Sequence, residues 1–301
     1  MTHDPNLGRV LDEIGCLAGV SREVTELEGG LTNHNYRVRT ARHDVVVRVS
    51  DLSGLLAVDR EAEFENSTRA ARAGVGAPVV DYLRGRGVLV VGYVPSTTYA
   101  DDDVAANLGK VAAVVRELHS AEPFVNRFDF FALQRRYLAI VQDNGFRLPQ
   151  GYLDLLPVAA RVEAAMSCHP EPLVPCHNDL LAANFLDTGE RLRIIDYEYS
   201  GMNESAFELG DIVQEAGLGP EALAELVTAY DGQESTRRIA RADLWRIMSA
   251  YGWTLWGAIQ AGGSDLDFDF WGWGMAKFDV AQGAFATKAF EDLLDVVGGP
   301  A

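Results

Sequence analysis

Hydrophobic and polar positions alternate in short runs over the first third of the chain. The segments 36–40 (YRVRT) and 44–50 (DVVVRVS) are rich in β-branched residues, alternate in polarity and are separated by ARH. This pattern is typical of a β-hairpin with one buried face. The apolar run 88–94 (VLVVGYV) predicts a buried third strand that ends at Pro95. We therefore expect a small β-rich unit at this end of the chain.

Apolar residues recur at helical spacing in most of the remaining sequence. The segment that begins at Asp59 (DREAEFENSTRAAR) predicts a helix, which GVGAP at 74–78 stops. The apolar residues of 108–118 keep helical spacing, and the acidic run 101–103 suits a helix N-terminus. Two short strands around a Thr-Gly turn are expected within 184–196 (NFLDTGERLRIID). Further helices are expected at 130–144, 151–167, 207–229, 240–262 and 273–295.

The change of periodicity near Pro95 divides the chain into two parts. Residues 1–95 are expected to form a β-rich lobe, and residues 96–301 a larger helical lobe. A chain of 301 residues is long enough for one large domain or two modest ones. The pattern therefore favours two lobes joined by a short connection.

Charge and composition narrow the class of protein. The formal net charge of −18 argues against nucleic acid or an anionic membrane as the partner, because both present phosphate. The three cysteines are odd in number and show no Cys-x-x-Cys spacing, which disfavours a disulfide framework or a zinc site. We find neither a secretory signal pattern nor an apolar run long enough to cross a membrane. We therefore predict a cytoplasmic protein without membrane insertion.

The polar segment 177–196 offers the parts that phosphoryl transfer needs. His177, Asp179 and Asn184 have the spacing H-x-D-x-x-x-x-N. Asp196 follows the apolar run LRII. One carboxylate can accept the proton of an attacking hydroxyl, while an amide oxygen and a second carboxylate can hold Mg²⁺ against the phosphates of ATP. A polar hairpin with an N-capping Asp would use similar residues, but the full set favours a site.

The stretches CHNDLLAANFL and IIDYEYSG resemble the catalytic segment of the choline/ethanolamine kinase family. This family lies within the aminoglycoside-phosphotransferase-like group, so the resemblance implies an α+β, two-lobed protein-kinase-like fold that uses ATP and Mg²⁺. It implies Asp179 as the catalytic base, with His177 supporting the loop. It implies Asn184 and Asp196 as Mg²⁺ ligands. Glu198 follows Asp196 by two residues and would face the metal or a substrate cation if the strand continues.

A glycine pair precedes the first strand of the hairpin. The segment LEGGLTNHNYRV contains Gly29 and Gly30, and then Thr32 and Asn33 as donors for phosphate. Gly-Gly before a strand is usually a plain turn. Its likeness to the G-G-x-T-N-x-x-Y segment of the family implies a loop that covers the phosphates of ATP.

A cation for the phosphates is expected on the second strand of the hairpin. Arg48 occupies the place where protein kinases have Lys, and an arginine can bind phosphate bidentately. Its partner on the following helix is Glu61 or Glu63, and the Arg-Glu pair at the helix start favours Glu61. The nucleotide base is expected against the connection 90–96, which includes Tyr93.

All five tryptophans lie between 245 and 273, close to several acids. Aromatic residues at helical spacing usually form core, yet aromatic faces with a carboxylate also bind quaternary ammonium ions. The segment resembles the W-x-x-W-x-x-x-Q helix of choline kinases, which implies that Trp253 and Trp256 contact choline. It also implies substrate contacts for Glu215 and for Trp273, which stands where the family commonly has tyrosine.

We expect an ATP-dependent kinase that phosphorylates choline, or a close amino alcohol, to give phosphocholine and ADP. Ethanolamine, thiamine, an amino sugar or an aminoglycoside are alternative acceptors. A catalytically retired kinase fold is disfavoured because Asp179, Asn184 and Asp196 are all present. The sequence specifies neither the oligomeric state nor the pathway that the product serves.

Overall fold

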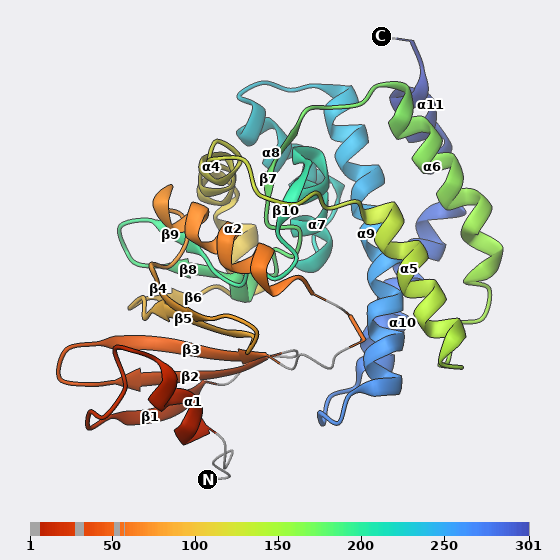
Figure 1. Ribbon diagram of the computed structural model, residues 1–301. Helices are drawn as coiled ribbons and strands as arrows, with labels where there is room; N and C mark the ends of the chain where they lie inside the picture. Colours follow the sequence, from red (N-terminus) through yellow and green to blue (C-terminus); the bar gives the residue numbers. More distant parts are fainter. Residues whose placement is uncertain (1–6, 28–32, 51–54, 57, 301) are drawn as a thin grey trace.

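The computed structural model describes residues 7–27, 33–50, 55–56 and 58–300. Its N-terminal part contains an antiparallel sheet of five strands in the order β1-β2-β3-β5-β4. The remainder is mostly helical and includes two small sheets. Figure 1 shows the strands β1–β3 at one end of the molecule and the long helix α9 (Thr236–Gly263) within the helical part.

The strands of the larger sheet are β1 (Glu23–Leu27), β2 (Asn33–Arg39), β3 (Asp44–Ser50), β4 (Val79–Leu83) and β5 (Val88–Gly92). β2 and β3 form the predicted hairpin, whose register pairs Tyr36 with Val47 and Val38 with Val45. These four side chains are buried and pack against the apolar face of α1 (Leu7–Glu13). Alternation of polarity thus gives the sheet one covered face.

Helix α2 (Arg60–Arg72) confirms the helix predicted for this segment. The side chain of Asp59 caps it by accepting hydrogen bonds from the backbone N–H groups of Glu61 and Ala62. The helix ends before Gly74, which has a φ of +76° that favours glycine. In Figure 1, α2 lies between the five-stranded sheet and the helical part, where it can connect the two.

The helical part is arranged around α9, which is buried along most of its length and contacts α5, α7 and α10. The acidic run at 101–103 begins a helix, as predicted. The other helices are α3 (Asp101–Ala106), α4 (Leu108–His119), α5 (Phe130–Asp143), α6 (Leu156–Cys168), α7 (Ser205–Glu215), α8 (Pro220–Asp231), α10 (Phe270–Phe285) and α11 (Lys288–Gly298), with single turns η1 (Leu153–Leu155) and η2 (Ala182–Asn184).

Two glycines let α9 and α10 approach closely. A Cβ added to Gly257 of α9 would lie 2.9 Å from the Cα of Gly274 in α10 and 2.9 Å from the carbonyl oxygen of Phe270. No side chain fits there without moving one helix. Trp256 and Trp273 each immediately precede one of these glycines, so the close contact brings the two tryptophans together.

Two of the long helices expected from sequence are each a pair of helices. The segment 207–229 divides into α7 and α8, and Gly217 between them has a φ of +64°. The segment 273–295 divides into α10 and α11, and the side chain of Thr287 caps the second helix by accepting from Phe290 N–H. Apolar periodicity continued through both breaks, so the pattern alone did not reveal them.

Short strands complete the helical part. The two strands predicted around the Thr-Gly turn are β8 (Phe185–Asp187) and β9 (Leu192–Ile194), which pair antiparallel. β6 (Thr97–Thr98) pairs with β8, and β7 (Leu173–Cys176) with β10 (Gly201–Glu204). β6, β7 and β10 are too short for a periodic signal. The lobe boundary after residue 95 stays a prediction.

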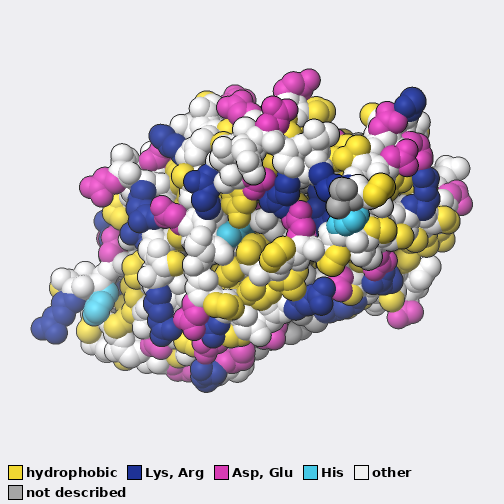
Figure 2. Space-filling model, turned by 90° about the horizontal axis from the view of Figure 1, so that it is seen from above, with side chains coloured by type: hydrophobic (Ala, Val, Ile, Leu, Met, Phe, Trp, Pro, Cys, Tyr) yellow, Lys and Arg dark blue, Asp and Glu magenta, His cyan; other side chains and the backbone are white. Residues whose placement is uncertain are grey.

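Two further predictions concern the charge of the surface and insertion into a membrane. The face in Figure 2 carries Lys and Arg side chains interspersed with Asp and Glu, without a continuous basic area. Among the described residues, no helix is both long and apolar enough to cross a membrane.

Candidate active site

The loop that follows β7 is fixed by buried side chains. The backbone N–H groups of His177 and Asn178 donate to the carboxylate of Glu208 in α7, at 2.7 and 3.4 Å. Asn178 has a φ of 68°, a left-handed conformation that asparagine tolerates. Its side-chain amide donates to the carbonyl oxygen of Tyr199 at 3.0 Å. The start of the loop is therefore held on both sides before the chain reaches Asp179.

His177 supports the loop through both of its ring nitrogens. Its Nε2 lies 2.8 Å from the carbonyl oxygen of Ile195, and its Nδ1 accepts from the backbone N–H of Asp179 at 3.3 Å. This pattern assigns the proton to Nε2. Burial lowers the pKa of His177, which favours the neutral ring. The side chain thus joins the residue before Asp196 to the loop that carries Asp179.

The structure brings Asp179, Asn184 and Asp196 together. The amide nitrogen of Asn184, in η2, donates to the backbone carbonyl oxygen of Asp179 at 2.8 Å. The backbone N–H of Ile195 donates to the carbonyl oxygen of Asn184 at 3.1 Å, which places Asp196 beside them. Asp196 follows β9 with a φ of 72°, an uncommon conformation for a residue other than glycine.

Arg48 lies near these acids and has Glu63 as its glutamate partner, while its contact with phosphate stays a prediction. Arg48 in β3 forms ion pairs with Glu63 of α2 and with Asp196. The Glu61 carboxylate instead pairs with the exposed Arg84, so the preference for Glu61 was wrong. Residues two apart on a helix point in nearly opposite directions, and α2 presents Glu63 to the sheet.

A second set of polar contacts joins the N-terminal part to the segment after Asp196. Arg60 at the start of α2 lies 3.1 Å from Glu198 and 2.8 Å from Glu63. The side-chain amide of Asn33 in β2 donates to Glu198 at 3.0 Å. Asn33 and Arg60 thus contact the same carboxylate, that of Glu198. Contacts of Asn33 with phosphate and of Glu198 with a metal or a substrate cation stay predictions.

The structure describes only one of the remaining residues that were predicted to bind the nucleotide. Gly30 and Thr32 lie outside the described residues. Tyr93 follows β5, where its backbone N–H donates to the carbonyl oxygen of Asp44 at 3.0 Å and its ring lies 3.5 Å from the guanidinium of Arg37. A contact between Tyr93 and a nucleotide stays a prediction.

Asp179 lies in a strongly acidic environment. Burial raises the pKa of its carboxyl well above the usual range, and the carboxylates of Asp211 and Glu215 raise it further. Glu198 and Asp196 act in the same direction. Positive charge brought to this site would favour the ionised form that accepts a proton.

Trp256 and Trp273 form an aromatic pair near this acidic region. Their ring centroids are 5.0 Å apart, with the rings in an edge-to-face arrangement. Lys277, one turn after Trp273 on α10, places its Nζ 4.3 Å from the Trp273 ring centroid. The same Nζ donates to Glu215 at the end of α7, at 2.6 Å. Glu215 and Trp273, two of the residues expected to bind a cation, thus contact the ammonium of a lysine.

Trp253 has different neighbours from the other two tryptophans. Its ring packs edge-to-face against Tyr199 at 5.1 Å and Phe130 at 5.4 Å, and it is 3% exposed. Its indole N–H donates to Asp211 at 3.1 Å. Trp253 therefore contributes to the core around the acidic site, and a direct contact between Trp253 and the acceptor stays a prediction.

Sequence reasoning missed three contributors to this site and ranked a fourth second. Glu63 was named only as the second choice, while Arg60, Glu208 and Lys277 were not identified. Glu208 and Lys277 are charged residues within otherwise apolar helical stretches, AFELG and GMAKF. A charge at a position that periodicity assigns to a buried face was the available signal.

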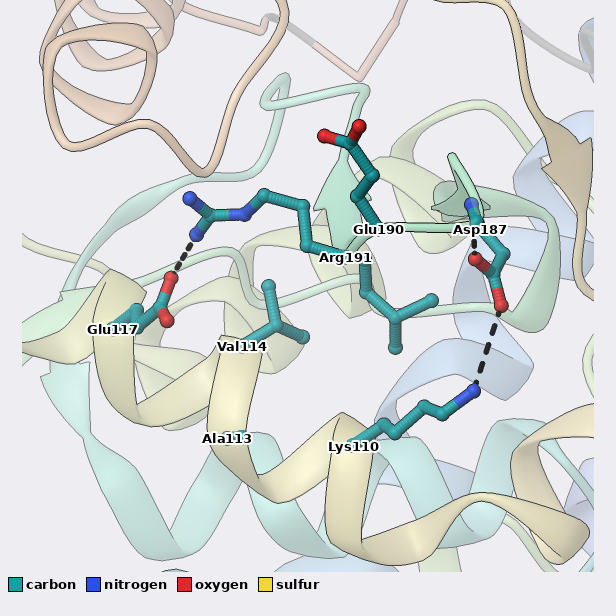
Figure 3. A pocket seen from close by; sticks show the side chains of 9 residues that line it. Lys110, Ala113, Val114, Glu117, Asp187, Glu190 and Arg191 are labelled. Atoms are coloured by element: carbon teal, nitrogen blue, oxygen red, sulfur yellow. Dashed lines mark hydrogen bonds and ion pairs between the residues drawn. The ribbon is translucent and has the colours of Figure 1, made fainter.

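Figure 3 shows a separate cavity of about 230 Å³ between α4 and the turn that connects β8 and β9. Lys110 and Asp187 form an ion pair across it at 3.8 Å, and Arg191 pairs with Glu117. None of the predicted site residues lines this cavity.

Comparison with known proteins places the chain among phosphotransferases. Residues 23–244 match the family described as "Phosphotransferase enzyme family". A choline/ethanolamine kinase family protein of Mesorhizobium loti, known from its crystal structure, is 32% identical. That alignment covers 98% of this chain and 99% of the relative, with a TM-score of 0.85.

Two curated relatives extend this result. Protein LicA of Haemophilus influenzae is 29% identical over 77% of this chain and 72% of its own length. Ethanolamine kinase 2 of Rattus norvegicus is 26% identical over 91% of this chain and 83% of its own length. The kinase-like α+β fold and an ATP-dependent phosphotransferase activity on a small alcohol are thereby confirmed. The chain belongs to the phosphotransferase enzyme family and, within it, to the choline/ethanolamine kinase family.

Proposed function

We propose that the protein transfers the γ-phosphoryl group of ATP to the hydroxyl of choline or a close amino alcohol, giving phosphocholine and ADP. The observation that carries the proposal is an alkylammonium group, that of Lys277, bound between Glu215 and the face of Trp273, on which Trp256 packs. A carboxylate together with aromatic faces is the environment that organic cations prefer. Glu215 is also close enough to Asp179 to influence its pKa.

Asp179 is the proposed base. It accepts the hydroxyl proton as the acceptor oxygen forms a bond to the γ-phosphorus and the bond to the ADP oxygen breaks. Arg48, held by Glu63, positions the phosphates of ATP. Catalysis then comes mainly from alignment and charge neutralisation, as phosphoryl transfer requires.

Asn184 and Asp196 are the proposed Mg²⁺ ligands, and their chemistry fits. The amide nitrogen of Asn184 is used by the backbone of Asp179, which leaves the amide oxygen for a cation. Asp196 supplies a carboxylate whose side chain is 32% exposed. Both are hard oxygen donors of the kind Mg²⁺ takes. A bound Mg²⁺ would neutralise charge on the phosphates during transfer.

Ethanolamine is the second candidate acceptor. Lys277 shows that a primary ammonium can donate a hydrogen bond to Glu215, which a trimethylammonium group cannot do. Relatives of this chain include ethanolamine kinase 2. Aromatic faces favour choline and the carboxylate favours ethanolamine, so the two must be compared directly.

An ADP-release screen of the purified protein tests the proposal. Choline, ethanolamine, thiamine, amino sugars and aminoglycosides are supplied separately with Mg·ATP. We expect the highest kcat/KM with choline or ethanolamine. A preference for an aminoglycoside, or no turnover with any of these acceptors, would contradict the proposed acceptor class.

A further inference from the structure

We propose that Lys277 lowers the affinity of the protein for cationic acceptors by occupying the cation position, which we define as the space between the Glu215 carboxylate and the Trp273 ring. A cationic acceptor would then bind only by displacing the lysine ammonium from this position. This inference rests on the proposed function, because it assigns the same residues to the acceptor.

The lysine is held in the cation position by Glu215 of α7 and Trp273 of α10, and α9 supports the aromatic face. Lys277 and Trp273 are four residues apart on α10 and therefore lie on the same face. Glu215 comes from the end of α7, and Trp256 from α9 packs edge-to-face on Trp273. The side chains of Lys277 and Glu215 are only 8% and 4% exposed. The ammonium is thus enclosed in the site, unlike a surface lysine that reaches into solvent.

Charge compensation explains why a lysine is favourable in the cation position. The carboxylates of Glu215 and Asp211 both raise the pKa of Asp179. The positive charge of Lys277 lowers the pKa of Asp211. Without a substrate, the ammonium of Lys277 offsets part of this buried negative charge. A cationic acceptor can provide the same compensation once it is bound, so the two cations are alternatives in one place.

Competition of this kind lowers the apparent affinity for a cationic acceptor. If the position is free in only a fraction of the molecules, the apparent dissociation constant rises by the inverse of that fraction. A position that is free about one tenth of the time would weaken acceptor binding about tenfold. Binding of ATP, on the side of Arg48 and Asp196, does not involve this exchange.

Replacement of Lys277 by a neutral residue tests the inference. In Lys277→Gln, the amide can still donate a hydrogen bond to Glu215, so the buried carboxylate keeps a partner. We expect the KM for choline and for ethanolamine to fall about tenfold, while the KM for ATP stays within about twofold. A lysine that only stabilises the fold would give the opposite result, with weaker binding and lower turnover.

Matched controls separate charge from other effects. Lys277→Arg keeps the positive charge and should retain the wild-type KM for choline. Lys288→Gln makes the same chemical change at an exposed lysine that pairs with Asp292, and should alter nothing. The neutral alcohol 3,3-dimethylbutan-1-ol has the shape of choline without its charge. It should bind more weakly than choline to both proteins, because it must take the same position but cannot replace the charge of the lysine.

A binding measurement keeps this inference separate from the choice of substrate. Tetramethylammonium is titrated against wild-type protein and Lys277→Gln, and tryptophan fluorescence is recorded. Tighter binding by the variant supports the inference even if choline is not phosphorylated. Equal or weaker binding overturns it, even if choline turnover by the wild type supports the proposed function. If Lys277→Gln does not fold by circular dichroism, Lys277→Met is used in the same titration.

Discussion

Asp211 is a buried carboxyl group with an incomplete set of partners. Its Oδ1 accepts from the Ser249 hydroxyl at 2.5 Å and the Trp253 indole at 3.1 Å, whereas its Oδ2 has no hydrogen-bond partner among the described residues. Burial, reinforced by Glu215, raises the pKa of Asp211 to about 7. Ionisation of Asp211 near neutral pH therefore lowers the free energy of unfolding.

The sign of this effect gives a stability prediction. Because the pKa of Asp211 is higher in the folded protein, folded Asp211 holds its proton to higher pH, and the stability of the wild type falls as pH rises from about 4 to about 7. Asp211→Asn removes this dependence and retains an acceptor oxygen. We expect the variant to gain on the order of 2 kcal/mol over the wild type between pH 5 and pH 8, measured by denaturant unfolding.

An exposed aspartate provides the control for this experiment. Asp279→Asn changes the same group on the surface of α10 and should show no such gain with pH. A constant difference between Asp211→Asn and the wild type at both pH values would refute the assigned cause.

Sequence could predict which residues lie together in the site when they are close together in the chain. Asp179, Asn184 and Asp196 belong to a short motif, and the structure brings them together. The choice between Glu61 and Glu63 depended on the rotation of α2 against the sheet, which the helix sequence alone does not determine. The pairing of Lys277 with Glu215 involves residues on two different helices and had no local signal.

At the scale of elements, apolar periodicity located most helices and the central hairpin. It failed where a helix broke without losing its periodicity, as between α7 and α8. It also failed for the short strands β6 and β7, whose pairing is set by distant segments. The contact between α9 and α10 depends on glycines, which carry no hydrophobic signal.

The close approach of α9 and α10 predicts the effect of Gly257→Ala. The added methyl group would meet the Gly274 Cα and Phe270 carbonyl at 2.9 Å, so one helix must shift and separate Trp256 from Trp273. We expect a loss of about 1–3 kcal/mol in the free energy of unfolding and a higher KM for choline than in the wild type. The KM for ATP should change little.

A second glycine on α10 serves as the control for helix propensity. A Cβ at Gly283 would meet nothing within 4 Å, so Gly283→Ala should leave both Michaelis constants unchanged and stabilise the helix slightly. If Gly257→Ala behaves like Gly283→Ala, the close contact does not position the tryptophans.

At the scale of the whole molecule, polar contacts connect the five-stranded sheet and α2 to the segment that follows β9. Arg48 pairs with Asp196, and both Arg60 and Asn33 contact Glu198. The proposed nucleotide site lies at this junction, and the proposed acceptor site lies deeper, among α7, α9 and α10. Sequence predicted the two-part organisation from the change of periodicity. It could not predict these contacts, because they join residues more than a hundred positions apart.

Turnover by Asp179→Asn tests the central claim most directly. The amide preserves the shape of the side chain but cannot accept the hydroxyl proton, so kcat with choline should fall about 10²- to 10⁴-fold relative to the wild type in the ADP-release assay. Binding of Mg·ATP, measured by calorimetry on the same preparation, should be retained. If the kcat of Asp179→Asn equals that of the wild type, the assignment of Asp179 as the base and the mechanism built on it are contradicted.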